Sequence, residues 1–227
     1  MNIICGHYGS GKTNLTINLA VESAQKGEAV TVLDMDIVNP YFRTSDYRDF
    51  LLSQGIRLIE PTFAGTTLDT PSLPPQMYGA FDKEGENFFI DVGGDDAGTT
   101  ALGSMRSQLK KKNPQLIYVI NQYRVLSQTA DEAVVLLREI EKACGLKATA
   151  IVNNSHLGVE TTLEAVLNSL DFAEQTAEKC KLPLLYSTIP DFAIQTKENK
   201  FINENKKLKK IKRYVLFPWE TTHTAQS

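Results

Sequence analysis

Short apolar runs alternate along this chain with segments whose apolar residues recur every three or four positions. Apolar runs of about four to eight residues are typical of buried β-strands, and the longer periodicity is typical of helices that bury one face. The expected strands are Ile3–Cys5, Ala29–Asp34, Arg57–Glu60, Asn87–Asp91, Leu116–Asn121, Ala148–Asn153 and Leu184–Thr188. The expected helices lie near Lys12–Lys26, Thr44–Gln54, Pro75–Phe81, Thr99–Lys112, Gln128–Cys144, Glu160–Lys181 and Lys200–Lys212.

The order of these elements predicts the fold class. Strands that alternate with helices form right-handed crossovers and a mostly parallel sheet. The run Leu116–Ile120 is apolar throughout, as expected for a strand that is covered on both faces. We therefore expect an α/β fold of three layers, in which a mostly parallel central sheet of about seven strands is flanked by helices.

The chain shows no internal boundary. No linker, repeat or low-complexity tract divides its 227 residues, so we expect a single domain over residues 1–227. The longest irregular stretch is Pro61–Pro75, which holds four prolines and one glycine. Loops of this length often carry function, and this one could cover a substrate.

A complete phosphate loop follows the first expected strand. Residues 6–13 read Gly-His-Tyr-Gly-Ser-Gly-Lys-Thr, which fits the pattern G-x-x-x-x-G-K-[ST] between a strand and a helix. In such a loop the glycines let successive N–H groups face one concavity, and the helix that follows adds the positive end of its dipole. We expect Lys12 to reach the β- and γ-phosphates and Thr13 to ligate Mg²⁺. The expected nucleotide contacts of the loop are Gly6, Tyr8, Gly9, Ser10, Gly11, Lys12, Thr13 and Asn14.

Polar residues stand at the carboxyl ends of several expected strands, where open parallel sheets bind their ligands. They are Asp34 and Asp36 after the second strand, Asp91, Asp95 and Asp96 after the fourth, Asn153 and Asn154 after the sixth, and Pro190 with Asp191 after the seventh. Carboxylates beside a phosphate loop suit a divalent metal ion and a polarised water. Asp95 and Asp96 fit a solvated acidic turn as well as they fit a metal site.

Composition and charge narrow the class of protein. Hydrophobic residues make up 42% of the chain and charged residues 22%, as in globular proteins. No apolar stretch approaches the roughly 20 residues that span a bilayer, and we expect no signal peptide before the first strand. Cys5, Cys144 and Cys180 are isolated, which is typical of reduced thiols in a cytoplasmic protein and offers no zinc or iron–sulfur ligand set.

The net charge of −3 conceals a basic C-terminal segment. Residues 197–213 hold eight Lys or Arg and two Glu residues, a local charge of +6. Leu208, Ile211 and Val215 would share one face of a helix, so we expect a C-terminal helix that packs this face on the domain, followed by a tail, over about 200–227. The alternative is a surface for acidic lipid, nucleic acid or an acidic partner, but the segment lacks the interleaved aromatic residues of a membrane anchor.

The sequence resembles the MinD/ParA-like branch of P-loop ATPases, which has a deviant Walker A loop. The resemblance covers about residues 1–195. It rests on motifs in the same order: Gly6–Thr13, Val32–Asp36, Phe89–Gly94, Ile151–Asn154 and Thr188–Asp191. It implies binding of ATP/ADP with Mg²⁺ and hydrolysis of ATP.

The resemblance also implies roles for individual residues. Asp36 would orient or activate the hydrolytic water, Asp34 would support magnesium-bound water, and Lys12 would act with them in catalysis. Asp91 would be the Walker B aspartate, so that the metal set is Thr13, Asp36 and Asp91. Gly94 would sense the γ-phosphate, Asn153 would contact adenine, and Pro190 with Asp191 would frame the base.

One position departs from the family pattern. The signature lysine of the loop, which crosses a dimer interface to the partner's nucleotide, is replaced here by His7. A histidine is mostly neutral at pH 7 and shorter than lysine, so it cannot act as a permanent cationic finger. This puts an ATP-dependent homodimer in doubt. Arg43 or Arg106 could supply the missing cation, and we favour Arg43 because its turn follows Asp36.

Three classes of function stay open. The paired aspartates favour a regulatory or assembly ATPase that switches an unknown protein partner. The missing lysine and the long loop favour a small-molecule kinase or ligase-like enzyme related to dethiobiotin synthetase and CobQ proteins. A nucleotide-binding scaffold with negligible turnover is the third. ATP is expected over GTP because Asn153-Asn154-Ser155-His156 lacks the lysine and the aspartate of the guanine motif N-K-x-D.

Overall fold

The computed structural model describes residues 1–36, 43–60, 81, 85–216 and 220. Within them, eight strands form one sheet in which every pair is parallel, in the order β3-β2-β4-β1-β5-β6-β7-β8. The strands are β1 Asn2–Cys5, β2 Ala29–Met35, β3 Arg57–Ile59, β4 Glu86–Val92, β5 Gln115–Ile120, β6 Ala150–Asn153, β7 Leu184–Pro190 and β8 Leu208–Ile211. All seven expected strands are present, and β8 is additional.

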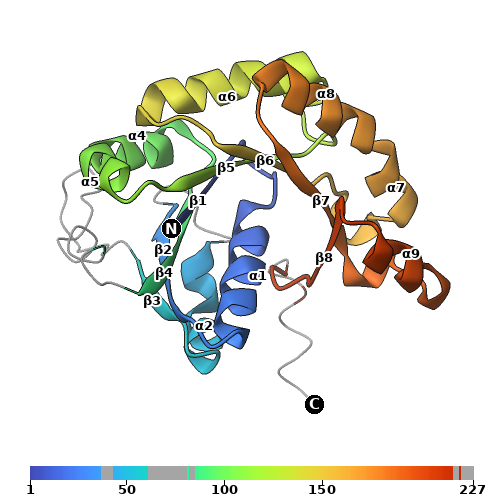
Figure 1. Ribbon diagram of the computed structural model, residues 1–227, viewed down its shortest axis with the longest axis horizontal. Helices are drawn as coiled ribbons and strands as arrows, with labels where there is room; N and C mark the ends of the chain where they lie inside the picture. The colour runs from blue at the N-terminus through green and yellow to red at the C-terminus, as the bar shows by residue number, and fades with distance from the viewer. Residues whose placement is uncertain (37–42, 61–80, 82–84, 217–219, 221–227) are drawn as a thin grey trace.

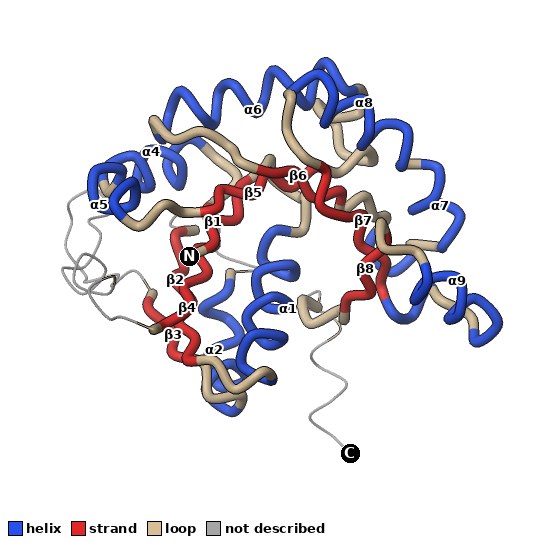
Figure 2. Tube along the Cα trace, viewed as in Figure 1, coloured by secondary structure: helices blue, strands red, loops and turns tan. Residues whose placement is uncertain are grey.

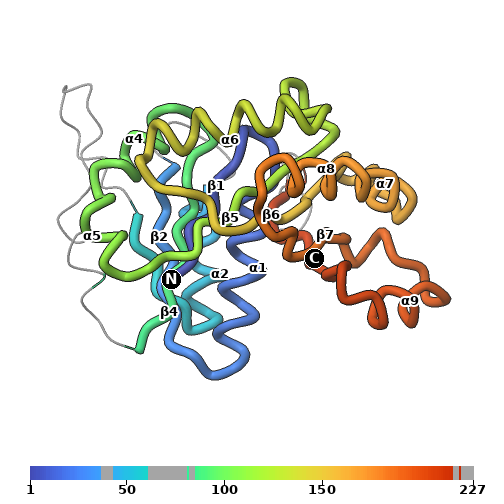
Figure 3. The backbone as a smooth tube through the Cα atoms, turned by 45° about the horizontal axis from the view of Figure 1, so that its top comes forward, coloured from blue at the N-terminus to red at the C-terminus, as the bar shows by residue number. Residues whose placement is uncertain are grey.

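Helices cover both faces of this sheet, which confirms the three-layer α/β fold (Figure 1). The helices are α1 Lys12–Gln25, α2 Arg48–Ser53, α4 Asp96–Ser104, α5 Arg106–Lys111, α6 Ala130–Cys144, α7 Leu163–Asn168, α8 Leu170–Cys180 and α9 Asn199–Glu204. Helices α1 and α2 lie within the concave side of the curved sheet, whereas α4, α5, α6 and α8 lie on its outer side (Figure 2). Figure 3 shows α9 beside the β7–β8 end of the sheet, far from α5.

The central strands are buried on both faces, as their continuous apolar pattern predicts. In β5, Leu116, Tyr118 and Ile120 pack into the core beneath α4, α6 and α8. The alternate residues Ile117 and Val119 pack against the core beneath α1 and α2. Such alternation places every side chain of the strand in one of the two cores.

Several expected helices are shorter or divided. The segment expected at Thr99–Lys112 forms α4 and α5, which meet at Met105, and the segment expected at Glu160–Lys181 forms α7 and α8, which meet at Ser169. A 3₁₀ turn at Thr44–Tyr47 precedes α2. The expected helix Pro75–Phe81, apart from Phe81, and the loop Pro61–Pro75 lie outside the described residues.

The predicted helix Lys200–Lys212 is wrong beyond Glu204. Helix α9 ends at Glu204, and Leu208–Ile211 form β8, which pairs with β7 through Ser187 to Pro190. The cause is an ambiguity in spacing: two residues three positions apart share a helical face but lie on opposite faces of a strand. Leu208 packs with Val166, Ile189 and Ile202 on one face of the sheet, while Ile211 borders a cavity on the other.

None of the helices in the described part of the chain has both the length and the apolar character needed to cross a membrane.

Candidate functional site

The phosphate loop joins β1 to α1 and depends on glycine geometry. Gly9 and Gly11 have φ angles of 75° and 78°, in the left-handed region that favours glycine. A Cβ atom at Gly11 would lie 2.3 Å from Nδ2 of Asn154, so this position has no room for a side chain. Helix α1 begins directly afterwards at Lys12, and its N-terminal N–H groups face the loop.

Lys12 extends back across the loop that precedes it. Its side chain is buried, and Nζ donates a hydrogen bond to the carbonyl of His7 at 3.2 Å. Burial lowers the pKa of Lys12, and the nearby Asp91 and Asp36 oppose this shift. Gly94 touches the same group, because a Cβ atom there would lie 2.9 Å from Lys12 Nζ and 2.7 Å from the Tyr8 amide nitrogen. The structure thus brings Gly94 against the phosphate loop.

Strands β2 and β4 bring their carboxylates together behind the loop. Asp34 and Asp91 are paired in register, and both are buried. Asp34 accepts hydrogen bonds from the Asp36 and Ser45 amides at 2.9 and 2.8 Å. Burial raises the pKa of Asp34. Burial, followed by the charge of Asp34, raises the pKa of Asp91 to about 7.

Asp91 is held by threonine hydroxyls from two elements. Its oxygens accept hydrogen bonds from Thr44 at 2.5 Å and from Thr16 at 3.4 Å. A hydrogen bond from Thr13 also acts on its pKa in the opposite direction to burial. Thr13 and Asp91 are therefore neighbours, whereas Asp95, further along the same turn, caps α4 by accepting from the Gly98 amide at 2.8 Å.

These residues fit a Mg²⁺ ion that is held jointly with phosphate. Among the described residues, no three His, Cys, Asp or Glu side chains converge on one point to form a metal site. Mg²⁺ needs no such cage, because it keeps several waters and binds one or two protein groups plus phosphate oxygens. The buried hydroxyl of Ser10 also has no hydrogen-bond partner within the described chain, as expected for a group that awaits a phosphate oxygen.

A cavity of about 290 Å³ extends from the phosphate loop along the carboxyl ends of the strands. The phosphate loop, the start of α1 and Asp36 form one part of its wall, and residues at or after the carboxyl ends of β5, β6, β7 and β8 form the rest. The lining residues are Tyr8, Gly9, Gly11, Lys12, Thr13, Asn14, Asp36, Arg124, Asn154, His156, Gly158, Pro190, Phe192, Ile211, Arg213 and Val215. Its volume is near the lower end of the range of small-molecule sites.

The residues expected to contact the base occupy different positions. Asn153 is fully buried and does not line the cavity; its Nδ2 donates to the hydroxyls of Ser169 and Ser187 at 2.9 and 3.0 Å. Its neighbour Asn154 does line the cavity and donates to the Ser10 carbonyl at 2.7 Å. Asn154, and not Asn153, therefore contacts the phosphate loop. Asn153 holds the end of β6 in place through its buried hydrogen bonds.

Of the two residues expected to frame the base after β7, one lines the cavity and the other does not. Pro190 lines the cavity, whereas the Asp191 carboxylate accepts a hydrogen bond from the Phe192 amide at 2.9 Å. The ring of Phe192 borders the cavity and is 48% exposed. An aromatic ring in this place was not predicted.

The carboxyl end of β5 carries two residues of the site that were not predicted. Asn121 is buried and donates to the carbonyls of Gly9 and His156, both at 3.3 Å, so it ties the phosphate loop to the turn after β6. Arg124 lies over the loop, donates from Nε to the Gly9 carbonyl at 2.8 Å and lines the cavity. The signal was present, because both residues follow a strand at its carboxyl end.

Neither of the two cations that were considered as replacements for the signature lysine lines the cavity. Arg43 caps the 3₁₀ turn, and its guanidinium pairs with Asp46 at 3.7 Å. Arg106 lies beside Gly145 at the C-terminal end of α6. Arg124 is the arginine that the structure places against the phosphate loop itself.

His156 is neutral in this setting. Burial, together with the charges of Arg124 and Arg213, lowers its pKa to about 4. Its Nδ1 accepts a hydrogen bond from the Gly158 amide at 3.2 Å. The wall of the cavity next to Gly11 therefore carries an uncharged imidazole.

Comparison with known proteins identifies the fold. No protein-family model matches the chain, and neither does any curated protein sequence. Cell division protein FtsY from Thermotoga maritima is 14% identical, with a TM-score of 0.58 over 82% of this chain and 60% of that one. FtsY from Mycoplasma mycoides is 16% identical, with a TM-score of 0.57 over 83% and 60%. The signal recognition particle 54 kDa protein from Aeropyrum pernix, in complex with GDP, is 16% identical, with a TM-score of 0.54 over 82% and 40%.

These likenesses show that the chain has the fold of P-loop NTPases. At 14–16% identity they show the fold alone, and the chain spans 40–60% of the length of these three structures. The finer resemblance to MinD/ParA proteins stays a prediction from the motifs.

Proposed function

We propose that this protein binds a nucleoside triphosphate together with Mg²⁺, ATP in preference to GTP, and hydrolyses it slowly as a nucleotide-dependent switch. One observation carries the proposal. Lys12, Thr13 and Asp36 line a single cavity, and Gly94 lies against Lys12 at its edge. This combination supplies phosphate binding, a metal ligand and a carboxylate in one place.

The side chains divide the chemical work between them. The loop amides and Lys12 bind the β- and γ-phosphates, and Arg124 adds a second positive charge beside Gly9. Asp36 orients the attacking water. Thr13 and Asp91 would hold the Mg²⁺ ion, which would supply charge neutralisation at the phosphates.

Hydrogen bonds between Thr44–Tyr47 and the carboxylates support a switch. Thr44 donates to Asp91, and the Ser45 amide donates to Asp34. A metal ion and its waters would compete for the same oxygens, so nucleotide binding would change the contacts of this segment. A protein partner that reads the segment would then respond to the bound nucleotide.

The preference for ATP rests on the sequence after β6. Guanine is read by a carboxylate in the N-K-x-D motif, and His156 stands here at the position of that aspartate. The known structure with GDP is too distant to decide the base. ATP and GTP therefore have to be compared directly.

Calorimetric titration with ATP and GTP, with and without Mg²⁺, tests the binding. We expect Lys12→Ala to weaken triphosphate binding at least about a hundredfold, because it removes the cation that meets the phosphates. Lys26→Ala is the matched control, since Lys26 follows the other end of the same helix and is exposed. Equal affinities of the two variants would sink the proposal.

Turnover assays separate the classes of function. We expect slow release of ADP that does not depend on a small-molecule acceptor. Fast release that requires an acceptor would identify a kinase or ligase-like enzyme, and binding without release would identify a scaffold. The mass in solution with and without ATP tests for a nucleotide-dependent dimer.

A further inference from the structure

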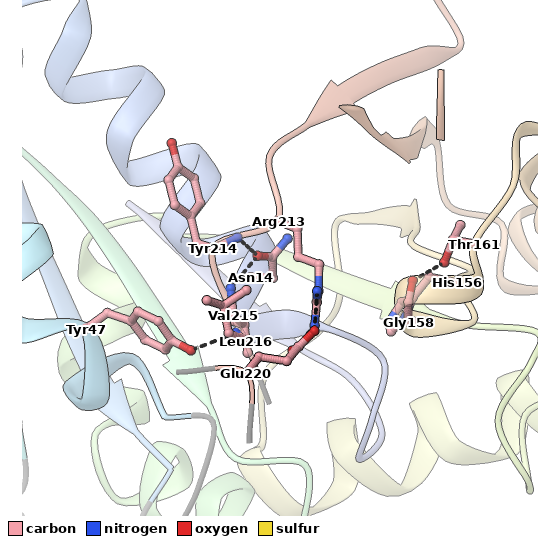
Figure 4. Close-up of polar contacts among 10 residues, drawn as sticks. All are labelled: Asn14, Tyr47, His156, Gly158, Thr161, Arg213, Tyr214, Val215, Leu216 and Glu220. Carbon is pink, nitrogen blue, oxygen red and sulfur yellow. Dashed lines mark hydrogen bonds and ion pairs between the residues drawn. The ribbon is translucent and has the colours of Figure 1, made fainter. Parts of the chain in front are cut away.

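The chain beyond β8 returns to the phosphate-loop helix. Residues 212–216, here called the C-terminal strap, run beside the first turns of α1 (Figure 4). The sheet pairing of β8 with β7 ends at Ile211, so the backbone of the strap needs other partners. Side chains of α1 supply them.

Two asparagines one turn apart on α1 hold the strap. Asn14 donates from Nδ2 to the Lys212 carbonyl at 3.0 Å, and its Oδ1 accepts from the Tyr214 and Val215 amides at 2.8 and 3.1 Å. Asn18 donates to the Lys212 carbonyl and accepts from the Lys212 amide, both at 2.8 Å. Asn14, which was expected to contact nucleotide, lines the cavity, and its side chain also holds the strap.

Further contacts fix the outer part of the strap. The Tyr47 hydroxyl accepts a hydrogen bond from the Leu216 amide at 3.0 Å. The guanidinium of Arg213 pairs with both oxygens of Glu220 at 3.0 and 2.5 Å (Figure 4). A two-point pair of this kind fixes the plane of the guanidinium.

Alternate residues from Ile211, the last residue of β8, through the strap face the cavity. Ile211, Arg213 and Val215 line it, whereas the Tyr214 ring packs on Phe50 with centroids 4.9 Å apart. A period of two is that of an extended chain with one face turned to a ligand. The strap is therefore a wall of the cavity.

The chemistry of this wall differs from that of the phosphate loop. Ile211 and Val215 are apolar, Arg213 presents a fixed planar donor, and the neutral ring of His156 lines the same cavity. Phe192 adds a half-exposed aromatic ring. Apolar contacts and an aromatic face suit a planar heteroaromatic base. Among the described residues of this wall, Arg213 is the one cation, and its charge is paired with Glu220.

We propose that the C-terminal strap is the base-binding wall of the nucleotide site, where Arg213 donates to a ring acceptor of a purine and Phe192 stacks on its face. The proposal rests on the nucleotide-binding function proposed above. It assigns part of the binding site to the end of the chain, beyond the motifs shared with MinD/ParA proteins. Asn14 links the two halves, because it lies in the first turn of the phosphate-loop helix and holds the strap.

Inorganic tripolyphosphate separates this proposal from the function on which it rests, because it offers the phosphates without a base. Affinities for ATP, GTP and tripolyphosphate are measured by calorimetry for the natural protein and for Arg213→Ala. We expect the variant to lose about tenfold in affinity for the purine nucleotide that the natural protein prefers, and to bind tripolyphosphate unchanged. Lys210→Ala, an exposed residue of β8 outside the cavity, serves as the control and keeps both affinities.

Phe192→Ala provides a second variant whose side chain is exposed enough to be removed without harm to the core. The same pattern is expected, because base stacking is lost and phosphate contacts remain. Equal losses for ATP and tripolyphosphate, or no loss for either, would overturn the proposal. Failure of the natural protein to bind tripolyphosphate and ATP alike would instead overturn the nucleotide-binding function.

Discussion

The absence of a side chain at Gly11 allows the phosphate loop to pack against the turn after β6. Its φ angle is 78°, and an added Cβ atom would lie 2.3 Å from Asn154 Nδ2 and 2.9 Å from His156 Nε2. We expect Gly11→Ala to weaken triphosphate binding more than about tenfold, because the loop must move away from Asn154. The free energy of unfolding should fall by about 1–3 kcal/mol. Calorimetry and urea unfolding measure the two effects.

Gly27→Ala serves as a control that separates the steric clash of a new Cβ atom from the strain of a positive φ angle. Gly27 has a similar φ angle of 82°, but nothing lies within 4 Å of its Cβ position. This control should cost only the strain of the left-handed conformation, about 1–2 kcal/mol, and leave nucleotide affinity unchanged. Unchanged triphosphate binding by Gly11→Ala would show that the loop tolerates a side chain there, contrary to the structure.

The C-terminal strap is held in place by single side chains of Asn14, Asn18 and Tyr47. Asn18 contacts the strap without lining the cavity, so its loss should loosen the strap and leave the wall residues intact. We expect Asn18→Ala to lower the free energy of unfolding by about 1–2 kcal/mol and to speed amide exchange at Lys212, Tyr214 and Val215. Hydrogen exchange followed by mass spectrometry measures this.

Gln25→Ala is the control for the strap, since Gln25 lies exposed at the end of the same helix. It should leave exchange in residues 212–216 as it is in the natural protein. Equal amide exchange of the strap in both variants would show that the Asn18 side chain does not hold the strap in place. Slower or unchanged exchange in Asn18→Ala would lead to the same conclusion.

The strands could be predicted from sequence more reliably than the C-terminal elements. Strands such as β5 carry apolar residues on both faces. This pattern can be recognised in the sequence without knowing which elements pack against the strand. The spacing of Leu208 and Ile211 fits a helix and a strand equally well. This segment forms a strand because it pairs with the edge of β7. That edge is a property of the folded sheet, which local periodicity does not contain.

Site residues that belong to short sequence motifs could be predicted. Site residues that come together from distant parts of the chain could not. The phosphate loop and the aspartates of β2 and β4 follow from motifs and from the rule of carboxyl ends. Asn121 and Arg124 follow from the same rule but carry no motif. Arg213 enters the cavity because side chains of α1 bind the strap, about 200 residues away. No local pattern encodes that contact.

The burial of His156 in the cavity wall makes the stability of the whole molecule depend on pH. The folded-state pKa of His156, about 4, lies below its usual value of 6.5. As pH falls from about 6.5 to about 4, the unfolded chain binds a proton there before the folded chain does, so this residue makes stability fall. Asp91, whose pKa is raised to about 7, acts in the opposite direction, so total stability does not isolate either group.

The difference between the natural protein and His156→Asn isolates the histidine. Asparagine keeps an acceptor for the Gly158 amide but does not titrate, while Arg124 and Arg213, the charged groups that act on His156, remain in place. We expect the free energies of unfolding, measured with urea, to differ by a constant amount above about pH 6.5. The natural protein should then lose stability relative to the variant as the pH approaches 4. Parallel curves over this range would mean that His156 is open to solvent, and that the strap and the turn after β6 do not enclose it.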